Sequence, residues 1–558
     1  MRGWTPVRVK GWILLMGLGV VRAESLPGIQ PNLPDQAEVE SLPSVEAQTG
    51  QDEVPNQTWA DALKVIRLRS AEGGDWFALA EGIEASGELV LPSPATLAAR
   101  LKPFLGHPVT DVSLGQMADE ILLHYDAEGF PVVLVSAPEQ DFSEGGLVID
   151  VEVGKVGKVG VTPPKHGNPE LIRQGLRLRT GEWLQRKKLE EQLTWYGRTG
   201  FRHPRLFVSP GEGLASADLL IALEERRPWQ VSVGYENSGP DVLGQDRMVF
   251  GVSGLLPNEH LLAWRGVMGM PASSLTANAI RWEIPLHRSH QVIQVDAAYA
   301  EVASRYLFRG IPLETEGSSW TLAVLDRMIL PKAGAWEQSL WAGFELKGTD
   351  QFLLFGGASV TPGEVVMADW KVSHRIEREW KSAGVKFSSD LRYSPGGLGD
   401  RNRDAAFRAY DLQADATYLI ANFDANAWWR TEKDWRWVGR WSLQAADSHL
   451  LPAEQLGAGG YQTVRGVDER AYSMDNGAVG GLEVQTPVIS VIPRCDFRLL
   501  AFFDHAALQD DDGGSVSLSS VGLGLRARLW GHVDLRFDHG WRLDDTEHRN
   551  HLGVSMSF

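Results

Sequence analysis

Two groups of side chains near the carboxy-terminal end of the sequence have the residue types of a metal site. His548 and His551 form a His-x-x-His pair, and Asp510-Asp-Asp-Gly-Gly514 is rich in carboxylates, as calcium loops are. Neither group has the remaining ligands at a fixed spacing. We therefore expect both to lie in solvated loops, and we predict neither a metal nor another cofactor.

Motifs of catalysis are missing from the sequence as well. It contains no Gly-x-Ser-x-Gly nucleophile elbow, no Gly-x-x-x-x-Gly-Lys phosphate loop and no dinucleotide-binding fingerprint between a strand and a helix. We predict that the chain is not an enzyme. A lipase-like triad assembled from distant residues stays open as an alternative, because such a triad need not be local in sequence.

The charge balance argues against a nucleic-acid partner. The chain has 54 basic and 72 acidic side chains, and its net charge of -18 repels a phosphate backbone. Its 558 residues are enough for more than one folded unit. Cys495 is the single cysteine of the sequence and cannot form an internal disulfide.

The amino-terminal residues have the pattern of an export signal. Basic residues precede the apolar stretch 11–21, and Ala23 completes a cleavage-site pattern of small residues. The stretch is shorter than the ~20 residues of a spanning helix. We predict a signal peptide over residues 1–23, followed by a flexible linker over 24–75, which is rich in Pro, Glu and Gln and could include a plug segment.

Residues 76–226 show a mixed α/β pattern that occurs twice. Tyr125-x-x-x-Gly129-Phe130 recurs as Tyr196-x-x-x-Gly200-Phe201, each time after an amphipathic helix and before two strands. The glycine fits the end of the helix. The spacing predicts tandem copies of one small domain, at 76–156 and 157–226, although two similar helix-to-strand turns could also arise by chance.

From residue 227 to 558 the periodicity changes to that of strands. Runs of about ten residues alternate apolar with polar or small side chains and are separated by Gly, Asn, Asp and Pro. A soluble sandwich would show the same alternation. Fifteen of the 21 tryptophans lie in this part, and the final strand ends on the aromatic Phe558, a barrel signal. We predict a transmembrane barrel of about 16 antiparallel strands, at ~10 residues per strand plus connections.

These features together resemble the two-partner secretion transporters, the haemolysin secretion/activation proteins (ShlB/FhaC/HecB family) of the outer-membrane barrel-assembly superfamily. Gly129-Phe-Pro-Val-Val-Leu-Val-Ser-Ala-Pro138-Glu-Gln140 is similar to a strand and turn of the family's first POTRA domain, with Phe130 at a position where tyrosine is usual. The resemblance implies an α+β POTRA tandem followed by an all-β transmembrane barrel. The second POTRA domain corresponds to residues 157–226.

A loop motif in the barrel carries the same resemblance. Val464-Arg465-Gly466-Val467 is similar to the family's Val-Arg-Gly-aromatic loop, with Val467 in place of the aromatic residue. Strand motifs around Glu483 and Asp504 are similar to those that the loop arginine meets inside the barrel. Ala506 stands where glycine is usual, and its Cβ atom argues against a close approach of another backbone segment at that point.

The chemistry of this loop follows from its charges. An arginine confined in a barrel lumen is costly unless a carboxylate pairs with it, and Asp504 and Glu483 are the candidates for Arg465. In the alternative reading, Arg465 lies in an exposed, solvated glycine-rich loop and Asp504 merely faces the lumen.

The resemblance predicts a transporter in the outer membrane of a Gram-negative bacterium, with its POTRA domains in the periplasm. It would capture an unfolded exoprotein, haemolysin-like or filamentous-haemagglutinin-like, on strand edges and thread it through the barrel. We place capture at Pro131, Val133 and Val135 and at Phe201, Leu206 and Val208. Further expected partners are outer-membrane lipid and, during biogenesis, the barrel-assembly machinery, and we expect a monomer. The alternatives are a barrel assembly and insertion factor and a plain porin.

Overall fold

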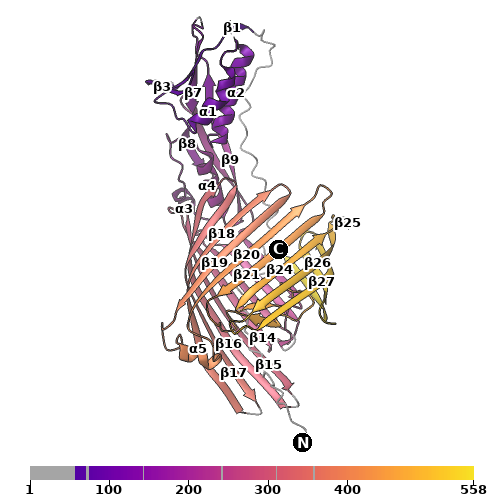
Figure 1. Cartoon of the computed structure of the whole chain (residues 1–558). Helices are drawn as coiled ribbons and strands as arrows, with labels where there is room; N and C mark the ends of the chain where they lie inside the picture. Colours follow the sequence, from indigo (N-terminus) through magenta and orange to yellow (C-terminus); the bar gives the residue numbers. More distant parts are fainter. Residues whose placement is uncertain (1–56, 71–73, 143, 241–242, 309–310, 356–357) are drawn as a thin grey trace. The chain divides into compact units, whose positions relative to one another are not determined.

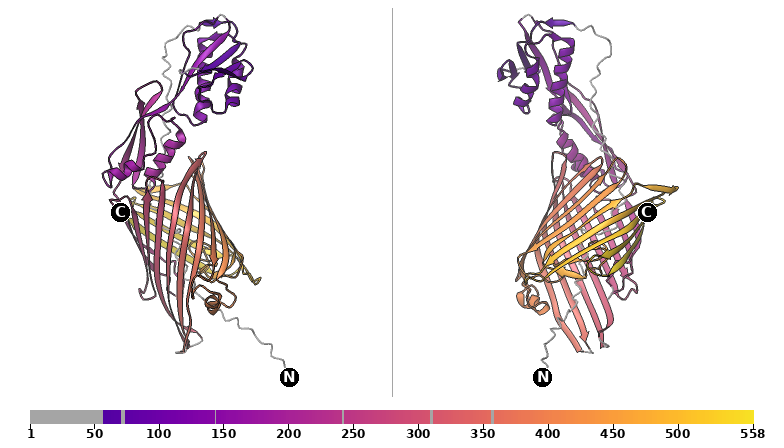
Figure 2. Two further views of the ribbon diagram at one scale, coloured as in Figure 1. Left: turned by 90° about the vertical axis from the view of Figure 1, so that its left-hand side faces the viewer. Right: turned by 45° about the vertical axis from the view of Figure 1, so that its right-hand side comes forward.

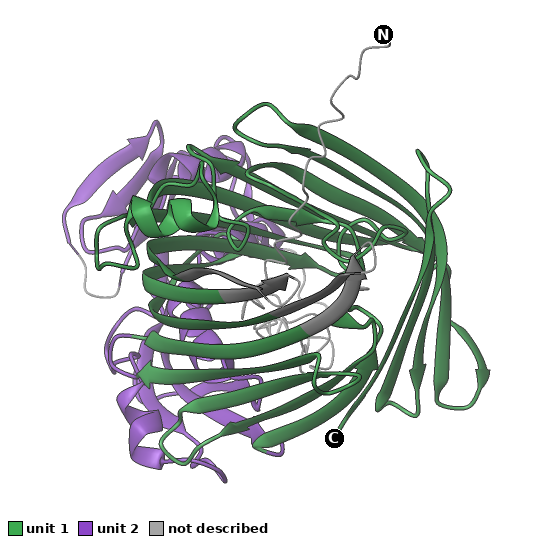
Figure 3. Ribbon diagram, turned by 90° about the horizontal axis from the view of Figure 1, so that it is seen from below, with its two compact units in different colours: residues 1–32, 228–286, 290–558 green, residues 33–227, 287–289 purple. Residues whose placement is uncertain are grey.

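The computed structural model describes residues 57–70, 74–142, 144–240, 243–308, 311–355 and 358–558. The predicted signal peptide and most of the predicted linker lie outside these residues. The described chain divides into two compact units, residues 57–227 with 287–289, and residues 228–286 with 290–558. Figure 3 shows the first unit in purple and the second in green.

The first unit begins with a domain in which two helices pack on a five-stranded mixed sheet. The sheet order is β3-β4-β2-β7-β6, with β2 parallel to β4 and β7, and β6 antiparallel to β7. Helix α2 starts at a capping box of Thr110 and Ser113 and buries Met117, Ile121 and Tyr125 against the sheet. Its elements are β1 Thr58–Ala60, β2 Val65–Arg69, β3 Trp76–Ala80, β4 Ile83–Ser86, α1 Pro94–Leu101, η1 Lys102–Phe104, β5 Val109–Thr110, α2 Asp111–Ala127, β6 Val133–Ser136 and β7 Gly146–Val153.

The second domain of this unit repeats the plan in a smaller form. Its sheet order is β8-β10-β9, in which β10 is parallel to β8 and antiparallel to β9. β2, β7 and β6 have the same relation in the first domain, so the predicted tandem is present as two sheets of like topology. The elements are β8 Lys155–Val161, α3 Pro169–Gln174, α4 Arg186–Gly197, β9 Arg202–Pro210 and β10 Ser216–Glu225.

The predicted boundary between linker and first domain is wrong. The predicted linker continues to residue 75, but β2 lies in the middle of the sheet, and the side chains of Ile66 and Leu68 are fully buried. The Pro-rich composition that indicates a linker ends at Pro55. The alternation of Ile66 and Leu68 with Arg67 and Arg69 is the pattern of a strand with one buried face.

The repeated tyrosine and glycine have equivalent structural roles in the two domains. Tyr125 and Tyr196 are buried, and their hydroxyl groups donate hydrogen bonds to the carbonyls of Val90 (2.7 Å) and Ile172 (2.9 Å). Gly129 and Gly200 have positive φ angles of 87° and 71°, which reverse the chain after each helix.

The second unit is a closed antiparallel barrel of 16 long strands in the part of the chain that the structure describes (Figure 1). Pairing of β11 with β29 closes it, and Phe558 extends this pairing through two backbone hydrogen bonds with Val231. The long strands are β11 Trp229–Glu236, β12 Arg247–Leu255, β13 Leu261–Gly269, β14 Leu275–Leu286, β15 Gln291–Phe308, β16 Ile311–Ala333, β17 Trp336–Phe355, β18 Ala358–Trp380, β19 Ala383–Pro395, β20 Thr417–Arg430, β21 Arg436–Ala446, β24 Asn476–Gln485, β26 Cys495–Gln509, β27 Ser515–Leu529, β28 Val533–Arg542 and β29 His548–Ser557.

The two ends of the barrel differ in their connections. β11 follows the first unit in the chain. The end of the barrel where β11 begins, here called the turn end, carries the turns 256–260, 431–435, 486–494 and 530–532 among others. The opposite end, the loop end, carries the two longest connections, 396–416 with helix α5 (Asp404–Tyr410) and 447–475 with β22 (Leu456–Ala458) and β23 (Tyr472–Met474). A short strand, β25 (Ile489–Ile492), lies in the turn 486–494.

Side chains alternate across the barrel wall as the sequence predicts. On β26 the outward Leu499 and Phe503 are about half exposed, whereas Asp504 and Ala506 are fully buried inside. Several exposed tryptophans lie at or near the turn end, as expected of an interfacial aromatic girdle. They are Trp229, Trp282, Trp380, Trp429, Trp435, Trp437 and Trp530.

The two groups first considered as metal ligands occupy different surroundings. Asp510–Gly514 is the predicted loop, between β26 and β27. The prediction of a solvated loop for His548 and His551 is wrong, because both lie on β29, where His551 is fully buried beside the ring of Tyr461. Within the described ranges, no three His, Cys, Asp or Glu side chains are grouped as a metal site would require. The described helices include none with the length and apolarity to cross a bilayer.

The positive φ of Gly129, after helix α2, predicts how its substitution changes the stability of the first unit. We expect Gly129→Ala to destabilise the first unit by about 1 kcal/mol, because its φ of 87° is unfavourable for a residue with a Cβ atom. Gly115→Ala in α2 is the matched control, because a methyl group at either position meets no atom within 4 Å. The control should stabilise by about 0.5–1 kcal/mol. The readout is the urea midpoint for protease resistance of the first unit in the full-length protein, and equal effects of the two substitutions would contradict this explanation.

Candidate functional site: the loop folded inside the barrel

The connection 447–475 folds back on itself as a two-stranded element. β22 pairs with β23 in antiparallel register, with Leu456 opposite Met474 and Ala458 opposite Tyr472. Arg470 closes the base of this loop by donating hydrogen bonds of 2.9 Å to the carbonyls of Pro452 and Gln455. The tip that carries Val464 to Val467 is therefore presented by an ordered stem.

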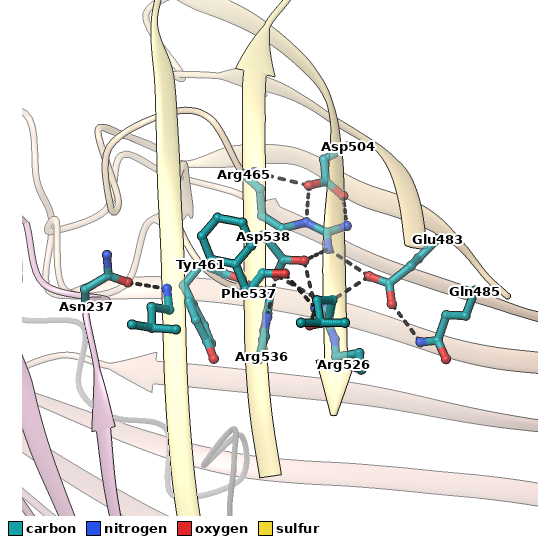
Figure 4. A network of polar contacts seen from close by, with 12 residues as sticks. Asn237, Tyr461, Arg465, Glu483, Gln485, Asp504, Arg526, Arg536, Phe537 and Asp538 are labelled. Atoms are coloured by element: carbon teal, nitrogen blue, oxygen red, sulfur yellow. Dashed lines mark hydrogen bonds and ion pairs between the residues drawn. The ribbon is translucent and has the colours of Figure 1, made fainter. Parts of the chain in front are cut away.

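Arg465 at the tip is fully buried and meets carboxylates from three strands (Figure 4). Its Nε and Nη2 donate to the two oxygens of Asp504 on β26 at 2.8 and 3.0 Å, and its Nη1 donates to Glu483 on β24 at 2.7 Å. Asp538 on β28 lies 3.5 Å from Nη1. The guanidinium group also lies 3.5 Å from the centroid of the Phe502 ring. Both hydrogen-bonding capacity and charge of the arginine are satisfied, which its burial requires.

Three further arginines surround these carboxylates. Arg526 lies 2.8 Å from Asp538 and 3.2 Å from Glu483, and Arg536 lies 2.6 Å from Asp538. Arg440 lies 3.5 Å from Asp504. Among the described residues, four guanidinium groups thus share three carboxylates. Each carboxylate would keep a positive neighbour if Arg465 moved away.

The backbone of the loop tip approaches the wall at β28. A Cβ atom at Gly540 would collide with the carbonyl of Arg465, and one at Gly466, whose φ is 115°, would meet the backbone of Gly540 at 3.0 Å. Gly540 is therefore the point of close approach. Ala506, which stands where glycine is usual, is not a point of close backbone approach. Its methyl group is buried in an apolar cluster with Val464 and Val467. Val467 packs there with 2% of its surface exposed.

A second ionic cluster holds the start of the loop to other strands. Glu454 is 3% exposed, and its Oε1 lies 2.8 Å from Nζ of Lys347 on β17. Its other oxygen accepts a hydrogen bond from Arg392 on β19. Asp369 on β18 lies 3.8 Å from Arg392 and accepts from the Tyr418 hydroxyl at 2.6 Å. Because β17 and β19 are separated in the barrel from β24, β26 and β28, the loop is fastened to the wall in two distinct places.

Apolar packing supports this second attachment. Leu450 and Leu451 at the start of the loop are buried with Phe407 of α5 and with Met367 and Ile420 of the wall. The long connection 396–416 thus packs on the start of loop 447–475. The loop is held by hydrophobic contact as well as by ion pairs.

A histidine links the two long connections at the loop end. His449 hydrogen-bonds Asp475 through Nδ1 at 2.8 Å and Asp411 through Nε2 at 3.1 Å. These hydrogen bonds, with Asp411 the larger cause, raise the pKa of His449 to about 10. The charged imidazole is therefore the stable form at neutral pH.

The structure brings the predicted loop residue and both of its predicted partners together. The other contacts of this site, Asp538, Arg526, Arg536, Arg440 and Glu454, were not named from the sequence. Asp534, Arg536 and Asp538 alternate with apolar residues, which indicates a polar lumen face but not the strand that each side chain meets. The predicted capture residues do not join this site, because they lie in the POTRA domains.

The fold and the inward loop define a class: outer-membrane β-barrels that carry POTRA domains. The family model described as haemolysin secretion/activation protein ShlB/FhaC/HecB matches residues 216–527, and the ShlB-type POTRA domain matches residues 80–154. The chain therefore belongs to the haemolysin secretion/activation protein family.

Two solved structures share the fold. CdiB from Escherichia coli superposes with a TM-score of 0.72 and 18% identity over 94% of each chain. CdiB from Acinetobacter baumannii gives 0.64 and 16% over 91% of each chain. No curated protein sequence matches the chain.

The family makes the chain a two-partner secretion outer-membrane transporter, with a partner that is a secreted exoprotein. Its barrel lies in the outer membrane and its POTRA domains in the periplasm. The turn end of the barrel is therefore periplasmic and the loop end extracellular.

We expect Arg465→Lys to release the loop tip and lower secretion of the partner exoprotein strongly. Lysine keeps the charge but cannot donate to both Asp504 oxygens and to Glu483, and each charge-assisted hydrogen bond lost costs about 1.5–3 kcal/mol. The measurement is surface protease cleavage within 447–475 together with secreted exoprotein.

Arg528→Lys is the matched control, since its pair with Asp534 is exposed at 56% and 42% and should contribute little. Equal cleavage and equal secretion in the two variants would mean that the hydrogen bonds of Arg465 to Asp504 and Glu483 do not order the loop.

The contact of His449 should weaken in alkali. Because its pKa is raised from 6.5 to about 10, its stabilising contribution is full below pH 6.5 and is lost as the pH rises through about 10. A spin label at Leu412, which is 86% exposed, should gain mobility over this range, with Cys495→Ala removing the native thiol. His449→Gln should abolish the pH dependence, and persistence of the transition in that variant would exclude His449 as its source.

Proposed function

We propose that the POTRA domains capture one unfolded exoprotein in the periplasm and that the barrel passes it to the cell surface. The observation that carries this proposal is an exposed edge strand in each POTRA sheet. β6 is the last strand of the order β3-β4-β2-β7-β6, and β9 is the last of β8-β10-β9. An extended chain can add to such an edge through backbone hydrogen bonds.

Each of these edges also presents an exposed apolar side chain. Leu134 on β6 is 42% exposed and Phe207 on β9 is 55% exposed. An edge with unpaired backbone groups and an apolar side chain is suited to an unfolded segment, which has both features available.

The side chains offered for contact differ from those named in the sequence analysis. Val133 and Val135 pack against the core of the first domain, and Leu134 between them faces outward. On β9, Leu206 and Val208 are half-buried on either side of the exposed Phe207. Pro131 and Phe201 precede the two strands. Capture therefore involves the same two edges, but the side chains in contact are Leu134 and Phe207, one residue away from those predicted.

Passage through the barrel needs the inward loop to shift, because both of its attachments lie inside. This step is compatible with the site, since Arg440, Arg526 and Arg536 remain beside the carboxylates. No nucleotide or cofactor enters the proposal, and folding of the exoprotein outside the cell would bias its movement. The exoprotein that we expect is haemolysin-like or filamentous-haemagglutinin-like. We further propose that the transporter works as a monomer in outer-membrane lipid and is inserted by the barrel-assembly machinery.

Photo-crosslinking in intact cells tests the capture step. A photoreactive residue at Leu134 or Phe207 should capture one large exoprotein, because both positions lie exposed on free edges. Leu123 is the matched control, since it is 58% exposed but lies on helix α2, which offers no strand edge. It should capture none.

Capture of many different nascent barrels from Leu134 and Phe207 would instead support the barrel-insertion function. Equal capture of the exoprotein from Leu123 would contradict recognition by these edges.

A further inference from the structure

The connection between β24 and β26 stands apart from the other periplasmic turns. It covers residues 486–494, the longest connection at this end of the described chain, with the sequence Thr-Pro-Val-Ile-Ser-Val-Ile-Pro-Arg. Its centre forms β25, which pairs with the start of β26 through Ile489–Phe497 and Ile492–Cys495. Figure 1 labels β25 at the edge of the wall beside β26 and β27.

Both faces of this strand are apolar and exposed. Val488 and Ile489 are each 40% exposed, Val491 is 81% exposed and Ile492 is 53% exposed. A turn that projects into water is expected to be polar, and a strand that covers a core has one buried face. This strand fits neither description, so its surroundings must be apolar on both sides.

The base of the connection is held firmly in place. Arg498 donates to the carbonyls of Asp434 (3.0 Å) and Thr486 (2.8 Å), and it pairs with the Asp434 carboxylate at 3.0 Å. At the other end, the Trp530 amide donates to the carbonyl of Arg494 at 2.7 Å. Its polar side chain, Ser490, is satisfied by a hydrogen bond to Asp496. The apolar side chains are therefore presented on a fixed support.

We propose that residues 486–494 form a membrane anchor that inserts into the periplasmic leaflet of the outer membrane. Continuity with the lipid-facing wall supports this partner. The outward side chains of the adjoining strands, Leu482, Leu499 and Phe503, are 44%, 53% and 46% exposed. Below the hydrocarbon region, an interface prefers aromatic and basic residues. Two residues of these types lie at the end of the connection 486–494: Arg494, and Trp530, which is 60% exposed and donates a hydrogen bond to the Arg494 carbonyl.

The right-hand view of Figure 2 is consistent with this placement, because the yellow carboxy-terminal part of the barrel ends there in a short projection from the wall. An anchor here acts on the segment that carries Glu483 and Asp504. β24 and β26, on which these carboxylates lie, are joined through it. It would keep β24 and β26 at a fixed depth in the membrane while Arg465 binds or leaves the carboxylates of Glu483 and Asp504.

Lipid contact at Val491 is testable with the full-length protein. In a Cys495→Ala background, an environment-sensitive fluorophore is attached at Val491→Cys or at Glu432→Cys, and the protein is reconstituted in phosphatidylethanolamine–phosphatidylglycerol vesicles. Glu432 is the matched control, because it is an exposed polar residue of the periplasmic turn 431–435. Brominated lipid should quench the label at 491 and shift its emission to the blue, whereas aqueous iodide should quench the label at 432.

Equal quenching of both labels by iodide, with no effect of brominated lipid at 491, would overturn the proposal. Protection of the label at 491 only after the secreted partner is added would overturn it as well, and would assign the hairpin to a protein. Heat-modifiable migration in gels verifies that each labelled barrel is folded, and Ile492→Cys replaces Val491→Cys if that variant does not fold.

Discussion

The burial of one guanidinium group dictates much of this structure. Arg465 has no exposed surface, and a charge in that position is tolerated only with several acceptors in fixed places. Glu483, Asp504 and Asp538 supply them from β24, β26 and β28, so the register of these strands, and of β27 between the last two, is tied to the loop. Small residues at Gly466 and Gly540 are needed for the same reason, because a side chain at either position would push the arginine out of reach.

The proposed passage of an exoprotein through the barrel requires that this loop be held firmly and still be able to leave. The structure meets the first requirement with two attachments, Arg465 toward β24, β26 and β28, and Glu454 toward β17 and β19. The second requirement is helped by Arg440, Arg526 and Arg536, which would leave no carboxylate uncompensated after release. We infer that the additional arginines lower the free-energy cost of moving the loop, in contrast to an isolated buried pair.

The sequence was sufficient for the architecture because barrels and repeats follow simple periodicities. Alternation over ten-residue runs predicted the strands, and the recurrence of Tyr125 and Gly129 as Tyr196 and Gly200 predicted the tandem domains. β2 was missed because its charged residues were grouped with the polar linker. Leu134 is exposed, whereas Val133 packs against the domain core. The local sequence pattern does not specify which of the two faces the core.

The site was only partly predictable for a different reason. Arg465 and its partners Asp504 and Glu483 came from a family resemblance, not from spacing. The contact of Glu454 with Lys347 joins residues 107 positions apart and depends on how a long loop folds into the lumen. Likewise, the alternation around Asp538 indicates a lumen face, but pairing between strands decides which arginine it meets.

Two separate attachments, at Arg465 and at Glu454, hold the loop in the lumen. Single-channel conductance in planar bilayers tests this claim most directly, with the unaltered protein, Glu454→Gln, Arg465→Ala and the double variant. If both attachments hold the loop, each single variant opens the pore only briefly, and the double variant conducts persistently. A double variant that conducts no more than Arg465→Ala would contradict the claim, because it would show that Glu454 does not restrain the loop.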